Sequence, residues 1–284
     1  MVKNRRFSYR SRGQILLITL LILTVATTIA LSLIGRATID LSMSNQLEES
    51  TRAFDAAEAG IEQALKTGSG TNQPVTLSSG VTYNVSVNSI GGATGVVQLA
   101  HKTLQNSTET LWLVEHTAEG LLNETPFYTA PTIELCWSRE TSPAPAAAIG
   151  VSVLYKRSSD STYQVARLAI DPATVSRNNG FNRVNFNTVG CGLNYYGTTI
   201  TFATLGIASA SDTILALRVR PFYADATIAI NGGASQIPKQ GNQIESVGET
   251  GTGVSRKVVV YQQYRAPQSI FDSVIHSDGE FKKP

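Results

Sequence analysis

The chain has 284 residues, only 15% of them charged, and a formal net charge of +2. Five of its 23 basic residues stand among the first thirteen positions, so the rest carries 18 basic against 21 acidic residues, a net charge of −3. Nucleic-acid binding needs a basic surface on the folded part. The charge balance therefore gives no indication of nucleic acid as a partner. The length allows one large or two small domains after the N-terminal segment.

A basic segment, residues 1–13, precedes an apolar run. The 21 residues from Gln14 to Ile34 include no charge and, as a helix, would span roughly 30 Å, the thickness of a bilayer core. Backbone groups in such a core must bond within the segment, which favours a helix. The basic flank places residues 1–12 in the cytoplasm. We expect a single-pass protein of the cytoplasmic membrane, with residues 14–35 in the bilayer and the C-terminal domain outside the cytoplasm.

Two other interpretations of the apolar run are a cleaved secretory signal and a plain signal anchor. A secretory signal has ~7–15 apolar residues before its cleavage site, and this run is longer. A plain anchor predicts a linker after the membrane, yet residues 36–67 contain no proline and one glycine. Apolar residues at helical spacing there predict an amphipathic continuation of the same helix. Glycines at 68 and 70 are expected to end it.

Two motifs bracket this helix. The basic leader ends in Arg12-Gly13, and the stretch from Arg52 to Ile61 reads RAFDAAEAGI. Together with the apolar run, residues 10–66 resemble the type IV pilin superfamily, in particular PilX-type minor pilins and the K-type minor pseudopilin of type II secretion. The resemblance implies that a prepilin peptidase cuts after Gly13. It also implies that Gln14 becomes the new N-terminus and a candidate for methylation.

One position departs from the pattern of the major pilins. The fifth residue after the cut is a glutamate in those proteins, where it neutralises the N-terminal amine of a neighbouring subunit, and here it is Ile18. A buried carboxylate is costly unless paired. Its absence resembles the K-type pseudopilin, which caps the tip, and favours a minor subunit over an atypical major pilin. The residues expected to serve filament assembly are Ile18, Phe54, Ala57, Glu58 and Ile61, with Phe54, Ala57 and Ile61 packing the helix against its own domain.

After residue 71 the pattern changes to the alternation typical of strands. Ten strand candidates separated by turn signals predict antiparallel sheets, most simply a sandwich. The expected fold class is α+β: a long N-terminal helix followed by a β-rich, sandwich-like antiparallel domain. Gly251-Thr252-Gly253 is expected to be a hairpin turn. The expected divisions are a leader at 1–13, helix halves at 14–35 and 36–67, a pilin-type β region at 68–124, a β-sandwich at 125–235, and a return strand with a loose tail at 236–284.

Side chains capable of chemistry are few and scattered. His101, His116 and His276 are well separated, so neither a metal site nor a cofactor is expected. Asp272, Ser273, His276 and Ser277 lie together in the tail, but a catalytic triad needs a rigid element. The predicted tail is not such an element, and we expect no enzyme.

The remaining notable residues have structural interpretations. We expect Trp112 and Trp137 in the core, and turn capping by Asp160, Asp171 and Asp212. Cys136 and Cys191 are expected either to form one disulfide, which an extracytoplasmic location permits, or to be separately buried.

These observations favour a non-enzymatic minor type IV pilin or pseudopilin, assembled into or at the tip of a pilus-like filament. Its expected partners are the cytoplasmic membrane, a prepilin peptidase and other pilin or pseudopilin subunits, with no small-molecule substrate. The alternative is an uncleaved, signal-anchored adhesin or binding module with an extracellular β-sandwich.

Overall fold

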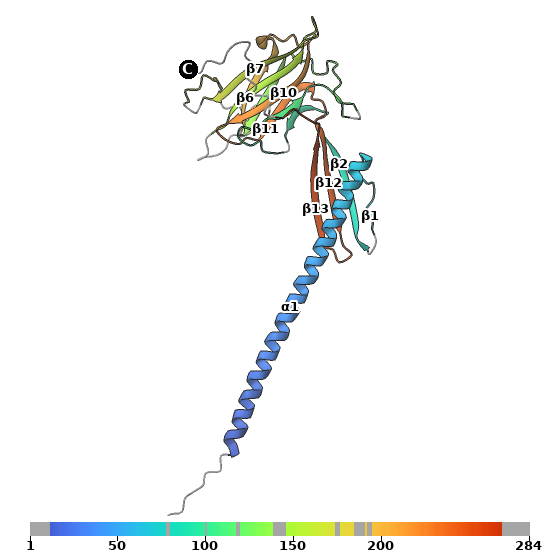
Figure 1. The fold of residues 1–284 in the computed structure, drawn as a ribbon, viewed down its shortest axis with the longest axis vertical. Coiled ribbons are helices and arrows are strands. Elements are labelled where there is room, and N and C mark those ends of the chain that lie inside the picture. Colours follow the sequence, from blue (N-terminus) through green and yellow to red (C-terminus); the bar gives the residue numbers. More distant parts are fainter. Residues whose placement is uncertain are drawn as a thin grey trace, which may run out of the picture. The chain divides into compact units, whose positions relative to one another are not determined.

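The computed structural model describes residues 12–77, 80–99, 101–117, 120–138, 146–173, 177–184, 191 and 195–268 (Figure 1). Within them one long helix at the N-terminal end is followed by strands in three sheets. The expected α+β class is confirmed. Contacts divide the chain into two compact units.

Helix α1 runs without a break from Arg12 to Thr67, 56 residues in all, and is roughly 84 Å long at the α-helical rise. The prediction of one continuous helix with two different halves is confirmed. Gly68 ends it with φ of 69°, and its N–H donates to the carbonyl of Ala64 at 2.8 Å. This left-handed glycine cap is typical of helix C-termini, as the glycines at 68 and 70 predicted.

The smaller unit consists of Met1–Ser86 and Glu245–Val258. Its strands belong to a four-stranded sheet in the order β1-β2-β12-β13. The bounds are Val75–Thr76 for β1, Thr82–Ile90 for β2, Gly241–Glu249 for β12 and Ser255–Gln263 for β13. The last two strands form a hairpin closed by Thr250 N–H to the carbonyl of Val254 at 3.0 Å, with Gly253 at φ of 86°. The predicted hairpin turn is confirmed.

The larger unit consists of Val87–Ile244 and Val259–Pro284. It holds a five-stranded sheet, β4-β10-β6-β7-β8, and a four-stranded sheet, β3-β11-β5-β9. The bounds in the first sheet are Glu109–Trp112 (β4), Thr213–Phe222 (β10), Ala148–Lys156 (β6), Tyr163–Pro172 (β7) and Asn182–Val184 (β8). In the second they are Thr94–Gln98 (β3), Ile228–Gln236 (β11), Thr132–Ser138 (β5) and Tyr195–Thr201 (β9). One hydrophobic cluster contains fully buried residues of both sheets, among them Trp137, Ile149 and Leu217.

One edge of the five-stranded sheet corrects the expectation of a wholly antiparallel arrangement. Strand β8 pairs in parallel with β7, with Ile170 opposite Asn182 and Pro172 opposite Val184. Side chains alternate between faces in both kinds of pairing. The sequence pattern of a three-residue strand therefore carries no signal for its direction.

The compact units also divide the chain differently from the expected ranges 68–124, 125–235 and 236–284. Strand β3 pairs with β11, and β4 pairs with β10, so both belong to the larger unit although they lie within 68–124. Strand β12, within 236–284, belongs to the sheet of β1 and β2. These pairings join segments more than one hundred residues apart, which local patterns do not specify.

Candidate functional site: an exposed apolar helix with one closely packed face

The first half of α1 is apolar and exposed. By length and composition, α1 is the one helix of the described chain that is apolar enough to cross a membrane. Its large apolar side chains between 15 and 34 are exposed by 49% at Ile18 up to 70% at Leu16. The hydroxyls of Thr19, Thr24 and Thr28 donate to carbonyls one turn back at 3.0, 2.9 and 2.8 Å. Apart from those hydroxyls the surface is almost wholly apolar, and the hydroxyls are satisfied within the helix itself, which suits lipid or an apolar bundle.

The predicted processing residues lie at the beginning of this helix. Gly13 and Gln14 belong to the first turn of α1, and residues 1–11 of the leader lie outside the described residues. Ile18 follows one turn later on the exposed apolar surface. The junction therefore leads directly into the helix, without an intervening loop.

The second half of α1 buries one face made mainly of small residues. Its members recur three or four positions apart and are Ala53, Ala56, Ala57, Gly60, Ile61 and Ala64. The facing sheet contributes the buried side chains of Val81, Tyr83, Val85 and Ser246. The small residues of the helix allow its backbone to approach the strands closely.

Two glycines mark where this approach is closest. A Cβ atom added at Gly60 would lie 2.7 Å from Val85 Cγ2 and 2.8 Å from Tyr83 Cδ2. One added at Gly248 of β12 would lie 2.6 Å from the backbone nitrogen of Ala57. These separations are well below the ordinary carbon contact distance of about 3.5–4.0 Å. At Gly60 the helix backbone thus lies directly on side chains of the sheet, and at Gly248 the backbone of the sheet lies directly on the backbone of the helix.

A polar rim borders the packed face. Thr252, in the β12–β13 turn, donates its hydroxyl to Glu49 Oε2 at 2.7 Å, and Arg52 pairs with Glu49 Oε1 at 3.0 Å. The hydroxyl bond from Thr252 is the main cause that lowers the pKa of Glu49, with further contributions from Thr250 and Arg52. Arg256 of β13 donates from Nε to Ser50 Oγ at 2.8 Å. These bonds fix the helix axially relative to the hairpin.

The expected assembly residues fall on two sides of the helix. Ala57 and Ile61 lie on the packed face at 0% and 7% exposure, whereas Phe54 is 44% exposed and Glu58 is exposed as well. Phe54 is therefore not part of the buried face, contrary to expectation. The sequence analysis selected Ala57 and Ile61 but missed Ala53 and Gly60; the repeated small residues at helical spacing were the available signal.

In the larger unit, the two cysteines are joined. Cys136 of β5 and Cys191 form a disulfide with their Cα atoms 6.2 Å apart. Glu134 lies close enough to both sulfur atoms to suggest a metal site, but sulfurs bonded to each other are not thiolate ligands. The cluster therefore has a structural explanation. Trp112 and Trp137 are 6% and 0% exposed, as predicted for core residues.

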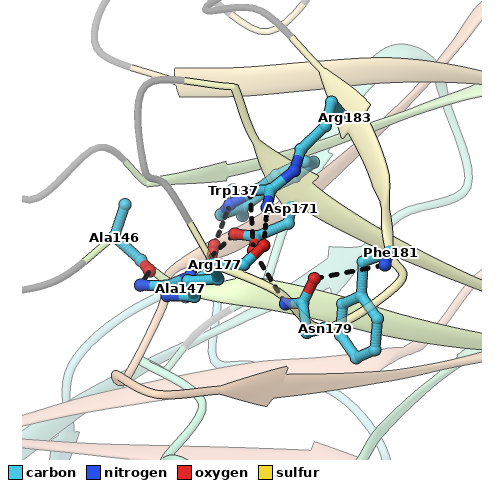
Figure 2. Close-up of polar contacts among 8 residues, drawn as sticks. All are labelled: Trp137, Ala146, Ala147, Asp171, Arg177, Asn179, Phe181 and Arg183. Atoms are coloured by element: carbon cyan, nitrogen blue, oxygen red, sulfur yellow. Dashed lines mark hydrogen bonds and ion pairs between the residues drawn. The ribbon is translucent and has the colours of Figure 1, made fainter.

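Asp171 differs from the turn-capping role predicted for it. Its side chain is fully buried at the end of β7 and is paired with Arg177 at 2.7 Å and Arg183 at 3.1 Å, while Asn179 donates to it at 2.8 Å (Figure 2). The cost of burying the charge is offset by these partners. Asn179 in turn accepts the backbone N–H of Phe181 at 3.1 Å, so the buried carboxylate positions the segment that leads to β8.

Capping does explain the other two aspartates. Thr162 donates both its N–H and its hydroxyl to Asp160, at 3.0 and 2.7 Å. The N–H groups of Ser158 and Ala208 donate to Asp212, each at 2.9 Å.

The described histidines contact aromatic rings. His101 meets Tyr261 edge to face at 4.6 Å, and His116 stacks on Tyr264 at 3.8 Å. His276, Asp272, Ser273 and Ser277 lie outside the described residues.

Comparison with known protein families finds a match in helix α1. Residues 12–62 match the family model described as PilX N-terminal. The predicted resemblance of this region to PilX-type type IV pilins is confirmed. The match includes the exposed apolar half of α1 and most of its packed face. A comparison with curated proteins finds no match to the chain.

Proposed function

We propose that the protein is a minor type IV pilin or pseudopilin, a non-enzymatic subunit that is stored in the cytoplasmic membrane and assembled into a pilus-like filament. The observation that carries this proposal is that the two halves of α1 have different surfaces. Its first half exposes an apolar surface on all sides. Its second half closes one face against a sheet through Gly60 and Gly248. Such a helix can exchange lipid for copies of itself while its own domain stays attached.

The proposed cleavage by a prepilin peptidase takes place at the beginning of the same helix. A prepilin peptidase would cut after Gly13, leave Gln14 as the terminus of the helix, and remove the five basic residues of the leader. The leader holds the chain in one orientation by its positive charge on the cytoplasmic side. Its removal leaves an apolar helix end without those charges, which permits extraction into a filament.

A position at the filament tip is supported by Ile18. A glutamate in its place would introduce a charge that needs a partner in an apolar bundle, and isoleucine neither needs nor supplies one. Phe54 and Glu58 present an exposed strip next to the packed face. This strip is available to a neighbouring subunit.

The test is coexpression of the full chain with a prepilin peptidase, with an inactive peptidase as the control. We expect a mass loss equal to residues 1–13 with the active enzyme only, and no loss in the variant Gly13→Arg. In cells that assemble pili, the wild-type chain should appear in sheared surface filaments and label their ends, whereas Gly13→Arg should stay in the membrane. An uncut chain that still displays its domain at the surface would instead support the signal-anchored adhesin.

A further inference from the structure

The open end of the β12–β13 hairpin, away from its turn, borders a polar hollow of about 480 Å³. Every described residue that lines it belongs to the larger unit. The volume is within the range of small-molecule sites, roughly 300–1,000 Å³. Two of the described lining residues are cations and none has a carboxylate side chain. The polar part of the lining consists chiefly of Thr117, Lys239, Asn242, Gln262, Gln263 and Arg265.

The backbone holds the two cations next to each other. The N–H of Tyr264 donates to the carbonyl of Gln240 at 3.3 Å. Lys239 precedes Gln240 and Arg265 follows Tyr264, so the two basic residues lie side by side on the two arms of the hairpin. Like charges opposite each other on paired strands are destabilising. Within the described part of the chain, neither Lys239 nor Arg265 has a hydrogen-bond or ion-pair partner, and an anion bound between them would offset the repulsion.

Both cations follow or precede a well-anchored residue. Gln240 is 4% exposed, and its Oε1 accepts the N–H of Trp112 at 2.7 Å while its Nε2 donates to the carbonyl of Trp112 at 2.8 Å. On the other arm, the ring of Tyr264 stacks on His116 with the ring centroids 3.8 Å apart. The backbone beside each cation is therefore fixed before a ligand arrives, which lowers the entropic cost of binding.

The rest of the lining suits hydroxyl groups. A Cβ atom added at Gly241 would lie 2.8 Å from the Cα atom of Gln263, so no side chain fills this position. Next to it, Asn242 donates from Nδ2 to Gln262 Oε1 at 3.3 Å. Each side-chain amide has both donor and acceptor atoms, as sugar hydroxyls require. Lysine and arginine bind carboxylate and phosphate through charge-assisted hydrogen bonds.

Two glutamates of the chain lie near the hollow in the sequence. The pKa of the Tyr264 hydroxyl is raised first by burial and then by the charge of Glu115, yet Glu115 is not a lining residue. Glu119 follows Thr117 by two positions and lies outside the described residues. An occupant of the hollow can therefore be external or the carboxylate of Glu119, and a variant at position 119 distinguishes them.

We propose that the hollow binds an anionic sugar, that is, a carbohydrate unit that carries a carboxylate or a phosphate group. Lys239 and Arg265 bind the anionic group, and the amides of Asn242 and Gln262 bind the hydroxyls. The larger unit then recognises acidic carbohydrate as well as belonging to a filament subunit. The site depends neither on cleavage after Gly13 nor on filament assembly.

The test is a titration of the full chain, in micelles of an uncharged detergent without a sugar headgroup, followed by saturation-transfer NMR of the added ligand. The probes are glucuronate, glucose 6-phosphate, glucose and inorganic phosphate. We expect glucuronate, glucose 6-phosphate or both to bind with a dissociation constant on the order of 1 mM, as is usual for ligands of this size. Glucose and inorganic phosphate should bind at least about tenfold more weakly, since each makes only one of the two sets of contacts. The tighter of the two anionic sugars identifies the anionic group.

Variants assign the binding to this hollow. Lys239→Gln and Arg265→Gln should each weaken it at least about tenfold, because a charge-assisted hydrogen bond is lost. Arg265 is exposed, so its replacement should leave the fold intact. Lys66→Gln removes the same charge from an exposed position of α1 in the smaller unit and should bind as the wild-type chain does.

Four results would overturn the proposal. The first is the absence of saturation transfer to both anionic sugars. The second is equally tight binding of glucose or of inorganic phosphate, which would show that the hollow does not recognise both groups together. The third is an equal loss of binding in Lys66→Gln, which would indicate unspecific attraction. The fourth is binding that appears only in Glu119→Gln, which would assign the two cations to the chain's own carboxylate.

Discussion

The two compact units bury their interiors in opposite ways. In the smaller unit, small residues let a helix and a sheet touch nearly backbone to backbone, with Ala53 and Ala57 on the helix and Gly248 on the sheet. In the larger unit, large side chains such as Trp137 and Leu217 fill the space between two sheets. Large side chains contribute more burial free energy each. Close backbone contact contributes little area but fixes the distance between two elements.

This difference predicts opposite sensitivities. Removing atoms should damage the larger unit most, because it leaves a cavity. Adding atoms should damage the helix–sheet contact most, because the neighbouring atoms must move.

The largest effect is expected for Trp137→Ala in the larger unit. Trp137 is fully buried and donates Nε1–H to the carbonyl of Ala147 at 2.9 Å. Its truncation should lower the free energy of unfolding by about 3–5 kcal/mol, partly because that carbonyl loses its partner. Denaturant unfolding of the full chain in detergent, followed by circular dichroism, measures the change. Trp137→Phe is the control and should cost clearly less; equal losses would show that the site tolerates a cavity.

A smaller effect of the opposite kind is expected for Gly60→Ala in the helix. The added methyl group meets Val85 and Tyr83 at 2.7 and 2.8 Å, and overpacking of this kind costs about 1–3 kcal/mol. Gly35→Ala is the matched control, since its Cβ meets nothing within 4 Å. That variant should be neutral or stabilising by up to about 1 kcal/mol from helix propensity. If both variants stabilise the protein alike, the helix does not approach the sheet as closely as described.

The helix was predictable because its signals are local. An uninterrupted apolar run, helical spacing and terminal glycines all lie within α1 and its end. The face it buries was only partly predictable. Phe54 falls at the helical spacing of the apolar residues and was therefore expected to be inside, yet it is 44% exposed and the buried face consists mainly of small residues.

The strands that were missed show the same limit. Strand β12 gave no apolar alternation, because two of its inward positions are Ser246 and Gly248, which lie under the helix.

The role of Asp171 was not predictable either. In the sequence Asp171 follows an apolar strand, as an ordinary capping residue does. Its partners Arg177 and Arg183 become neighbours only after the chain folds back. Such features depend on what the fold places opposite a residue, and no local pattern records it.

The smallest effect is a pH dependence from His116 in the larger unit. Burial lowers the pKa of its imidazole, and its buried Nδ1 has no hydrogen-bond partner within the described part of the chain. The folded state therefore binds a proton less readily than the unfolded state.

The stability of the folded state should fall as the pH drops through the ordinary histidine pKa of about 6.5 and level off below the lowered pKa. We expect a small loss between pH 7.5 and 5.5, since one proton contributes at most about 1.4 kcal/mol per pH unit. Thermal unfolding at both pH values measures it. His116→Gln should remove this part of the slope. An unchanged slope in His116→Gln would assign the dependence to another group.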